Sequence, residues 1–246
     1  MAYTIAVAGK GGVGKTTVST LLIRHLLRIG GPVLAIDADP NSNLNVLLGY
    51  TYKETIADIR EETRNLYSQN IPRGDFFNMR LQEIIVEGEG LDLLVMGRPE
   101  GPGCYCAVNN ILREYLKNLS ANYRFIVIDS EAGMEHLSRR TADNTDLLLL
   151  VTDSTNVGII SAINAFYTAK KANFKFKDAG IVINKTKGPL EQPKIDLIRN
   201  SGLSIKAILP FMEKIEGDSE KGLPLVGLYS NELSRIFDNI ICIPAR

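Results

Sequence analysis

The sequence predicts an α/β fold, a single doubly wound domain whose mostly parallel sheet has about seven or eight strands. Short apolar runs recur along the chain, and helical patterns separate most of them. A glycine-rich loop that contains two lysines follows the first of these runs. The 246 residues, of which 45% are apolar, lie within the range of one domain with one hydrophobic core.

The apolar runs mark the expected strands in chain order. They occupy residues 5–8, 33–36, 91–96, 125–128, 147–151, 181–183 and 205–209. Continuous apolar strands that alternate with helices, the clearest being Val18 to Leu27, are typical of a parallel sheet covered on both faces. Residues 51–90 interrupt this alternation, because charged residues surround scattered apolar ones. We expect a helical excursion at the surface there.

The loop after the first strand has the phosphate-binding pattern G-x-x-x-x-G-K-[ST], in Gly9-Lys10-Gly11-Gly12-Val13-Gly14-Lys15-Thr16-Thr17. Glycines let backbone N–H groups approach phosphate oxygens, and the helix that begins near Thr16 adds its unpaired donors. We expect Lys15 to reach the β- and γ-phosphates and the Thr16 hydroxyl to hold Mg²⁺. The expected nucleotide-binding residues here are Gly11, Gly12, Val13, Gly14, Lys15, Thr16 and Thr17, within one P-loop domain spanning residues 1–246.

Lys10 is a second lysine at the start of this loop. It lies beside the phosphates and cannot easily turn back onto those that its own loop cradles. Across a two-fold axis it could reach the nucleotide of a second copy, as an arginine finger does. The alternative is a solvated loop lysine. The trans interpretation predicts a nucleotide-dependent homodimer in which Lys10 is catalytic.

The loop resembles the deviant Walker A motif of the MinD/ParA partitioning ATPases, the nitrogenase iron protein and the metal-cofactor maturation ATPases, which are P-loop NTPases of the SIMIBI type. The resemblance implies that Lys10 crosses a dimer interface and that Asp37-Ala38-Asp39-Pro40-Asn41 is the first switch. In that role Asp39 would orient or activate the attacking water. A carboxylate at the carboxyl end of a strand, next to a phosphate site, suits this task. The alternative is an Asp-Pro turn.

Phe125-Ile126-Val127-Ile128-Asp129 is a Walker B pattern, in which Asp129 would hold Mg²⁺ through water. Ser130-Glu131-Ala132-Gly133 then corresponds to a second switch. The run ending Asn184-Lys185-Thr186-Lys187 begins like the guanine-reading N-K-x-D, but Lys187 is an obligate donor where guanine needs an acceptor. This favours ATP. The resemblance implies that Asn184 contacts adenine and that Pro210 flanks the base.

Cys104 and Cys106 lie two residues apart in a loop rich in glycine and proline. Two thiols are too few for a tetrahedral site, but a two-fold axis supplies four thiolates from two chains. Such a set suits Zn²⁺, Ni²⁺, Cu⁺ or an iron–sulfur cluster, and the alternative is a pair of unliganded thiols. Of the remaining candidate ligands, Cys242 is expected to be buried and both His25 and His136 to be structural.

Met96-Gly97, Gly103-Cys104-Tyr105-Cys106 and Asp129 to Leu137 resemble the CooC/AcsF-type nickel-insertion maturation ATPases of carbon monoxide dehydrogenase and acetyl-CoA synthase. The resemblance spans the chain. It implies that Cys104 and Cys106 from two subunits bind one Ni²⁺ or Zn²⁺ ion, and that the client is one of those two nickel enzymes. Ser130-Glu131 departs from the family pattern, which leaves the timing of the switch and the client open.

Two other functions compete with metal insertion. An electron donor like the nitrogenase iron protein uses cysteines far apart, whereas here no cysteine lies between Cys106 and Cys242. A positioning ATPase of the MinD or ParA type binds membrane or DNA. Its attraction to anionic surfaces is opposed by 28 basic residues balanced by 28 acidic ones, and by Glu232 and Asp238 in the last helical pattern. We therefore expect a protein that binds no nucleic acid and has no stable membrane association. No apolar run approaches the length of a bilayer span, so we also expect it to be cytoplasmic.

Overall fold

A seven-stranded sheet forms the centre of the computed structural model, which describes residues 2–65, 73–98, 119, 121–130, 145–225 and 231–240. The strands are β1 (Tyr3–Gly9), β2 (Val33–Ala38), β3 (Leu91–Val95), β4 (Phe125–Ser130), β5 (Thr145–Thr152), β6 (Phe176–Thr186) and β7 (Ser204–Pro210). They are ordered β3-β2-β4-β1-β5-β6-β7, and every neighbouring pair is parallel. The predicted α/β fold is confirmed, with a strand at each of the seven apolar runs.

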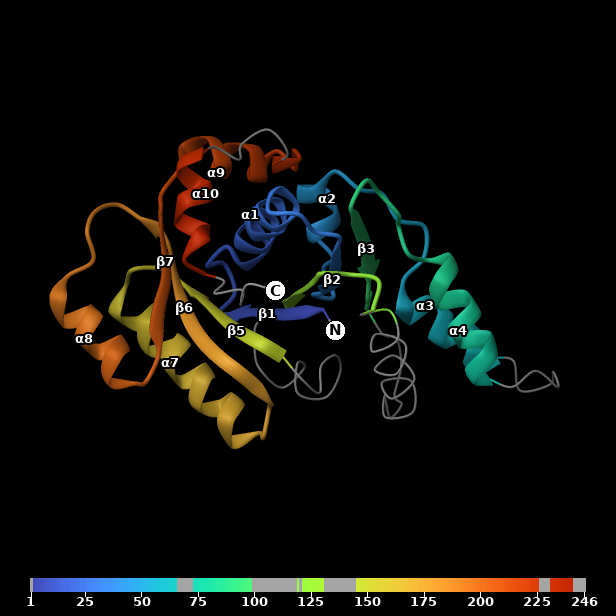
Figure 1. The fold of residues 1–246 in the computed structure, drawn as a ribbon, viewed down its shortest axis with the longest axis horizontal. Helices are drawn as coiled ribbons and strands as arrows, with labels where there is room; N and C mark the ends of the chain where they lie inside the picture. Colours follow the sequence, from blue (N-terminus) through green and yellow to red (C-terminus); the bar gives the residue numbers. More distant parts are fainter. Residues whose placement is uncertain are drawn as a thin grey trace.

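Helices cover both faces of the sheet, as Figure 1 shows. They are α1 (Lys15–Arg28), α2 (Leu44–Leu48), α3 (Ile56–Asn65), α4 (Arg73–Glu83), α7 (Asn156–Lys171), α8 (Gln192–Asn200), α9 (Glu213–Glu220) and α10 (Asn231–Asp238). Alternate residues of one strand enter different cores: Ile5 and Val7 of β1 pack with α1, whereas Ala6 and Ala8 belong to the cluster that includes α7. Because both faces are buried, the central strands are apolar without interruption.

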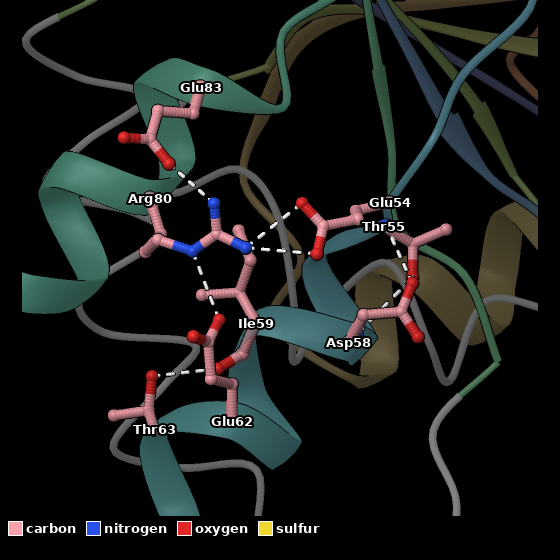
Figure 2. Close-up of polar contacts among 8 residues, drawn as sticks. All are labelled: Glu54, Thr55, Asp58, Ile59, Glu62, Thr63, Arg80 and Glu83. Carbon is pink, nitrogen blue, oxygen red and sulfur yellow. Dashed lines mark hydrogen bonds and ion pairs between the residues drawn. The ribbon is translucent and has the colours of Figure 1, made fainter. Parts of the chain in front are cut away.

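Residues 51–90 contain α3 and α4, which pack against each other and against the sheet. Ile59, Phe77 and Leu81 are fully buried in the same core as α7. Arg80 of α4 joins the two helices, because its guanidinium binds Glu62 of α3 at 3.0 Å, Glu54 at 2.9 Å and also Glu83 (Figure 2). This excursion is therefore fastened by apolar contacts on its inner side and by one branched ion-pair network on its outer side.

The last helix, α10, packs on α1 and the core. Leu233, Phe237 and Ile240 are buried, and the ring of His25 from α1 stacks on Phe237 with 6.0 Å between centroids. Burial lowers the pKa of His25, which is only 2% exposed, although the nearby Asp238 partly opposes this. The amphipathic pattern of α10 is thus used for internal packing. Within the described segments, no helix combines the length and the apolar character needed to cross a membrane.

Candidate nucleotide-binding site

The predicted phosphate loop and the acidic residues meet at the carboxyl edge of the sheet. The loop follows β1, whose neighbours on the two sides are β4 and β5. Asp129 lies near the end of β4, Asp37 near the end of β2 and Asn184 near the end of β6. Such an edge, where chain crossovers leave on opposite sides, is where ligands bind in doubly wound sheets.

Two glycines of the loop allow close approaches that no other residue permits. Gly9 packs on β5 so closely that a Cβ atom would lie 2.2 Å from the carbonyl oxygen of Val151. Gly14 has a left-handed conformation, with φ of +87°, and a Cβ there would lie 2.4 Å from Nδ2 of Asn184. Gly14 also precedes α1, whose first turn has neither a side-chain cap nor an acidic residue. The N–H groups and positive dipole end of α1 are therefore suited to an anion.

The two lysines of the loop lie in different environments. Lys15 is only 8% exposed, and its Nζ lies 3.4 Å from the carbonyl oxygen of Lys10, so the side chain folds back over its own loop. Lys10 is exposed. Lys15 thus has the geometry of a phosphate ligand within one chain, while the Lys10 side chain extends toward solvent at the same edge.

Asp129 is the buried acid of the site, with 1% of its surface exposed. Its Oδ1 accepts a hydrogen bond from the Ser19 hydroxyl at 2.8 Å. Burial raises the pKa of Asp129 to about 6, although the hydroxyls of Thr16 and Ser19 and the charge of Lys15 lower it. A carboxylate held in this way is poorly compensated in its ionised form, and a divalent cation would stabilise it.

Thr16 and Asp129 supply the hard oxygen ligands that Mg²⁺ prefers. In the described part of the chain, no group of three or more His, Cys, Asp or Glu side chains could enclose a metal ion. A Mg²⁺ ion at Thr16 and Asp129 would therefore take its other ligands from phosphate oxygens and water, as this ion commonly does. The residues present fit that ion.

Asp37 and Asp39 lie at the end of β2, in the segment predicted to be the first switch, and Asp37 is the register partner of Asp129. Asp37 is fully buried, and burial together with the Asp129 charge raises its pKa to about 7. Asp39 is partly exposed, and its Oδ1 accepts hydrogen bonds from the backbone N–H and the side-chain amide of Asn41 at 2.9 and 3.0 Å. The structure thus brings the predicted Asp39 to the same edge as the loop and Asp129.

Asn184 is buried against the phosphate loop, and its Nδ2 donates to the carbonyl oxygen of Val13 at 2.9 Å. An open cavity of about 580 Å³ lies at the ends of β6 and β7. Its lining consists of Thr186, Lys187, Gly188, Pro210, Phe211 and Glu213. Asn184 therefore braces the loop and is not among the residues that line this cavity, whereas Pro210 forms part of the cavity wall.

Several predicted residues lie outside the described segments. These are Cys104, Cys106, Cys242, His136 and the second switch after Ser130. Within the described segments, two residues of the site were not identified from sequence, Ser19 and Asp37. Ser19 lies three residues after Thr16, hence on the same face of α1, and this spacing was a usable signal. Asp37 was visible as the first acid of Asp37-Ala38-Asp39, but its role depends on the pairing of β2 with β4.

Comparisons with known proteins agree with this geometry. The family model for the CobQ/CobB/MinD/ParA nucleotide binding domain matches residues 4–225. An uncharacterized ATP-binding protein of Methanocaldococcus jannaschii is 45% identical over 232 residues, which are 92% of each chain. The carbon monoxide dehydrogenase accessory protein CooC of Rhodospirillum rubrum is 31% identical over 89% of this chain and 88% of that one. The MinD cell division protein of Aquifex aeolicus superposes over 100% of both chains with a TM-score of 0.70 at 22% identity.

Proposed function

The chain belongs to the CobQ/CobB/MinD/ParA family of nucleotide-binding domains and is an ATPase of the MinD/ParA class, and on this premise we propose that it is a homodimeric metallochaperone. It would use ATP hydrolysis to assist nickel insertion into carbon monoxide dehydrogenase or acetyl-CoA synthase. The observation that carries the proposal is that two separate features of the chain each require a second copy related by a two-fold axis. Lys10 is exposed at the nucleotide edge, and the pair Cys104 and Cys106 needs a second pair to complete a metal site.

The hydrolytic step follows from the residues at the carboxyl edge. Lys15 and the first turn of α1 bind the phosphates, and Thr16 and Asp129 hold the Mg²⁺ that the nucleotide brings. Asp39 accepts a hydrogen bond from the attacking water and directs its oxygen toward the γ-phosphorus. The oxygen of the water bonds to the γ-phosphorus as the bond from that phosphorus to the bridging oxygen breaks. ADP keeps the bridging oxygen, phosphate takes the oxygen of the water, and the proton that the water loses passes to phosphate or solvent. Lys10 of the second copy would neutralise the charge that develops on the transferred group.

The nickel or zinc ion is cargo in this scheme. Closure of the dimer on ATP would bring four thiolates together, two from each chain, around one ion. Hydrolysis or docking of the client would then open the dimer and release the ion. The similarity to the CooC accessory protein over most of both chains supports the choice of client class.

Metal stoichiometry tests the proposal directly. The protein would be loaded with Ni²⁺ or Zn²⁺ in the presence of ATP, and the metal in the isolated dimer measured by elemental analysis. We expect one ion per dimer, lost in the Cys104→Ala, Cys106→Ala double variant and retained in the matched control Cys242→Ala. Full stoichiometry in the double variant contradicts the proposal. Anomalous scattering from a nucleotide-bound crystal would identify the element and its position relative to the axis.

The same preparations separate the competing functions. Iron content with the absorption of a cluster, in anaerobically purified protein, would support an ATP-dependent electron donor. Binding to DNA or to anionic vesicles only with nucleotide would support a positioning ATPase. Neither outcome is expected for an ATPase whose acidic and basic residues balance and whose last helix packs its apolar side chains against α1.

A further inference from the structure

Asp37 closes the loop that joins β2 to α2. Both of its carboxylate oxygens accept backbone hydrogen bonds from that loop: Oδ1 from the N–H of Asp39 at 3.2 Å, and Oδ2 from the N–H of Leu44 at 3.0 Å. The side chain of Asp37 therefore holds both the beginning and the end of the loop. Leu44 is itself fully buried, which anchors the far end of the loop in the core.

Asp39 lies within this loop, between Asp37, whose side chain closes it, and Leu44, whose N–H group that side chain binds. Its backbone carbonyl accepts from the N–H of Ser42 at 3.0 Å, and its side chain accepts twice from Asn41. Ser42 adopts a left-handed conformation, with φ of +48°, which turns the chain back toward α2. The direction of the Asp39 carboxylate is thus set by a ring of contacts that begins and ends at Asp37.

An asparagine could not make both contacts, because its side chain has one acceptor oxygen and its amide nitrogen only donates. A carboxylate at this position is costly to bury, since Asp37 is the direct register partner of Asp129 on the neighbouring strand. Two buried acids side by side are unfavourable unless their oxygens accept hydrogen bonds. Asp37 uses both of its oxygens on the loop that carries Asp39.

We propose that Asp37 is a positioning residue for ATP hydrolysis, which holds the Asp39 carboxylate toward the γ-phosphate without touching the nucleotide itself. The inference rests on the hydrolytic centre of the proposed function. Asp37 also connects the two acids of the site, because one of its neighbours is the Mg²⁺-side residue Asp129 and the other is the water-side residue Asp39.

The test compares Asp37→Asn with the wild type in ATP turnover, ATP affinity and thermal unfolding. We expect kcat to fall by about tenfold or more, because the attacking water is no longer aligned. ATP affinity, measured with a fluorescent analogue, is expected to change by less than about threefold, because no phosphate ligand is lost. A kcat within threefold of wild type overturns the inference, and so does a loss confined to KM or to ATP affinity.

Asp153→Asn is the matched control. Asp153 follows β5 at the same edge, and its Oδ1 accepts a hydrogen bond from the N–H of Thr155, two residues later, at 2.9 Å. It has no register pairing with Asp129, because β1 lies between β5 and β4 in the sheet. Turnover is expected to be unchanged in this variant. If it falls as far as in Asp37→Asn, the effect is a general one of strand-end acids and the inference is wrong.

Two further variants keep the inference separate from the proposed function. If Lys15→Ala and Asp39→Ala retain full turnover, the hydrolytic centre is wrongly assigned. If both are inactive while Asp37→Asn is normal, only the role of Asp37 is refuted. Should Asp37→Asn not fold, hydrogen exchange of the wild type decides: the amides of Asp39 and Leu44 must be protected, and exchange at the rate of an open loop contradicts the inference.

Discussion

Ser19 donates a hydrogen bond from its hydroxyl to Oδ1 of Asp129 across 2.8 Å, and so joins the helix after the phosphate loop to the strand that carries the buried acid. Both side chains are almost completely buried. Replacing Ser19 by alanine should leave the carboxylate with one donor fewer and cost about 1–3 kcal/mol of stability. We also expect a higher Mg²⁺ concentration for half-maximal turnover. Urea unfolding and a Mg²⁺ titration measure the two effects. Ser204→Ala, at an exposed position, should show neither.

Lys10→Ala should bind ATP as the wild type does but fail to dimerise or hydrolyse it. The reason is that Lys10 is exposed, whereas Lys15 is the lysine that folds over the loop of its own chain. Light scattering with a non-hydrolysable analogue reports the oligomeric state, and phosphate release reports turnover. Wild-type turnover by a variant with unchanged oligomeric state would refute the role in trans.

The stability of the nucleotide-free protein should fall as pH rises from about 4 to 7 because of Asp37 and Asp129. Their folded pKa values, about 7 and about 6, lie above the ordinary value of 3.8, so the folded state holds protons that the unfolded state has released. The stabilisation is complete below pH 3.8 and is lost as pH passes the folded values. Thermal unfolding at several pH values measures this slope, which should be smaller in Asp37→Asn.

The effect of pH on stability through His25 has the opposite sign to the effect through the two acids. The test must therefore compare the wild type with Asp37→Asn. Burial lowers its pKa below 6.5, and stability from neutral His25 is lost as pH falls below that value. The slope of the wild type minus that of Asp37→Asn removes this contribution. An identical slope of stability against pH in both proteins between pH 4 and 7 would contradict the assignment of the raised pKa to Asp37.

Gly14→Ala should abolish ATP binding. A side chain there must adopt φ of +87°, which costs about 1–2 kcal/mol for a non-glycine residue. Its Cβ would also lie 2.4 Å from the Asn184 amide. This would displace the Asn184 side chain, which donates a hydrogen bond to the carbonyl oxygen of Val13 in the loop. Calorimetric titration with ATP measures the loss. Gly217→Ala, in α9 with no atom within 4 Å of the added Cβ, should bind ATP normally and unfold at slightly higher denaturant.

Arg80→Met should destabilise the protein by about 1–2 kcal/mol without affecting ATP turnover. The substitution removes the cation that three glutamates share between α3 and α4 (Figure 2) while keeping an apolar stem. The loss should be smaller in high salt, because these carboxylates are about half exposed. Lys194→Met, which breaks the single ion pair with the exposed Glu191, should cost less than about 0.5 kcal/mol. An effect on turnover would mean that the excursion communicates with the site.

The sequence by itself determined the fold class, the strands and the phosphate loop of this protein. Apolar runs and the G-x-x-x-x-G-K-T pattern are local signals, and a buried parallel strand or a glycine loop requires them whatever the rest of the chain does. Asp129 was recognisable for the same reason, as an acid that ends an apolar run.

Only the tertiary structure decided how the acids act together. The contact of Ser19 with Asp129 and the clamp that Asp37 places on the Asp39 loop both depend on the order of β2, β4 and β1 in the sheet. Strand order is set by how helices pack across both faces, which involves residues far apart in the chain. Burial, which raises the pKa of both acids, arises from the same packing, and no pattern of neighbouring residues encodes it.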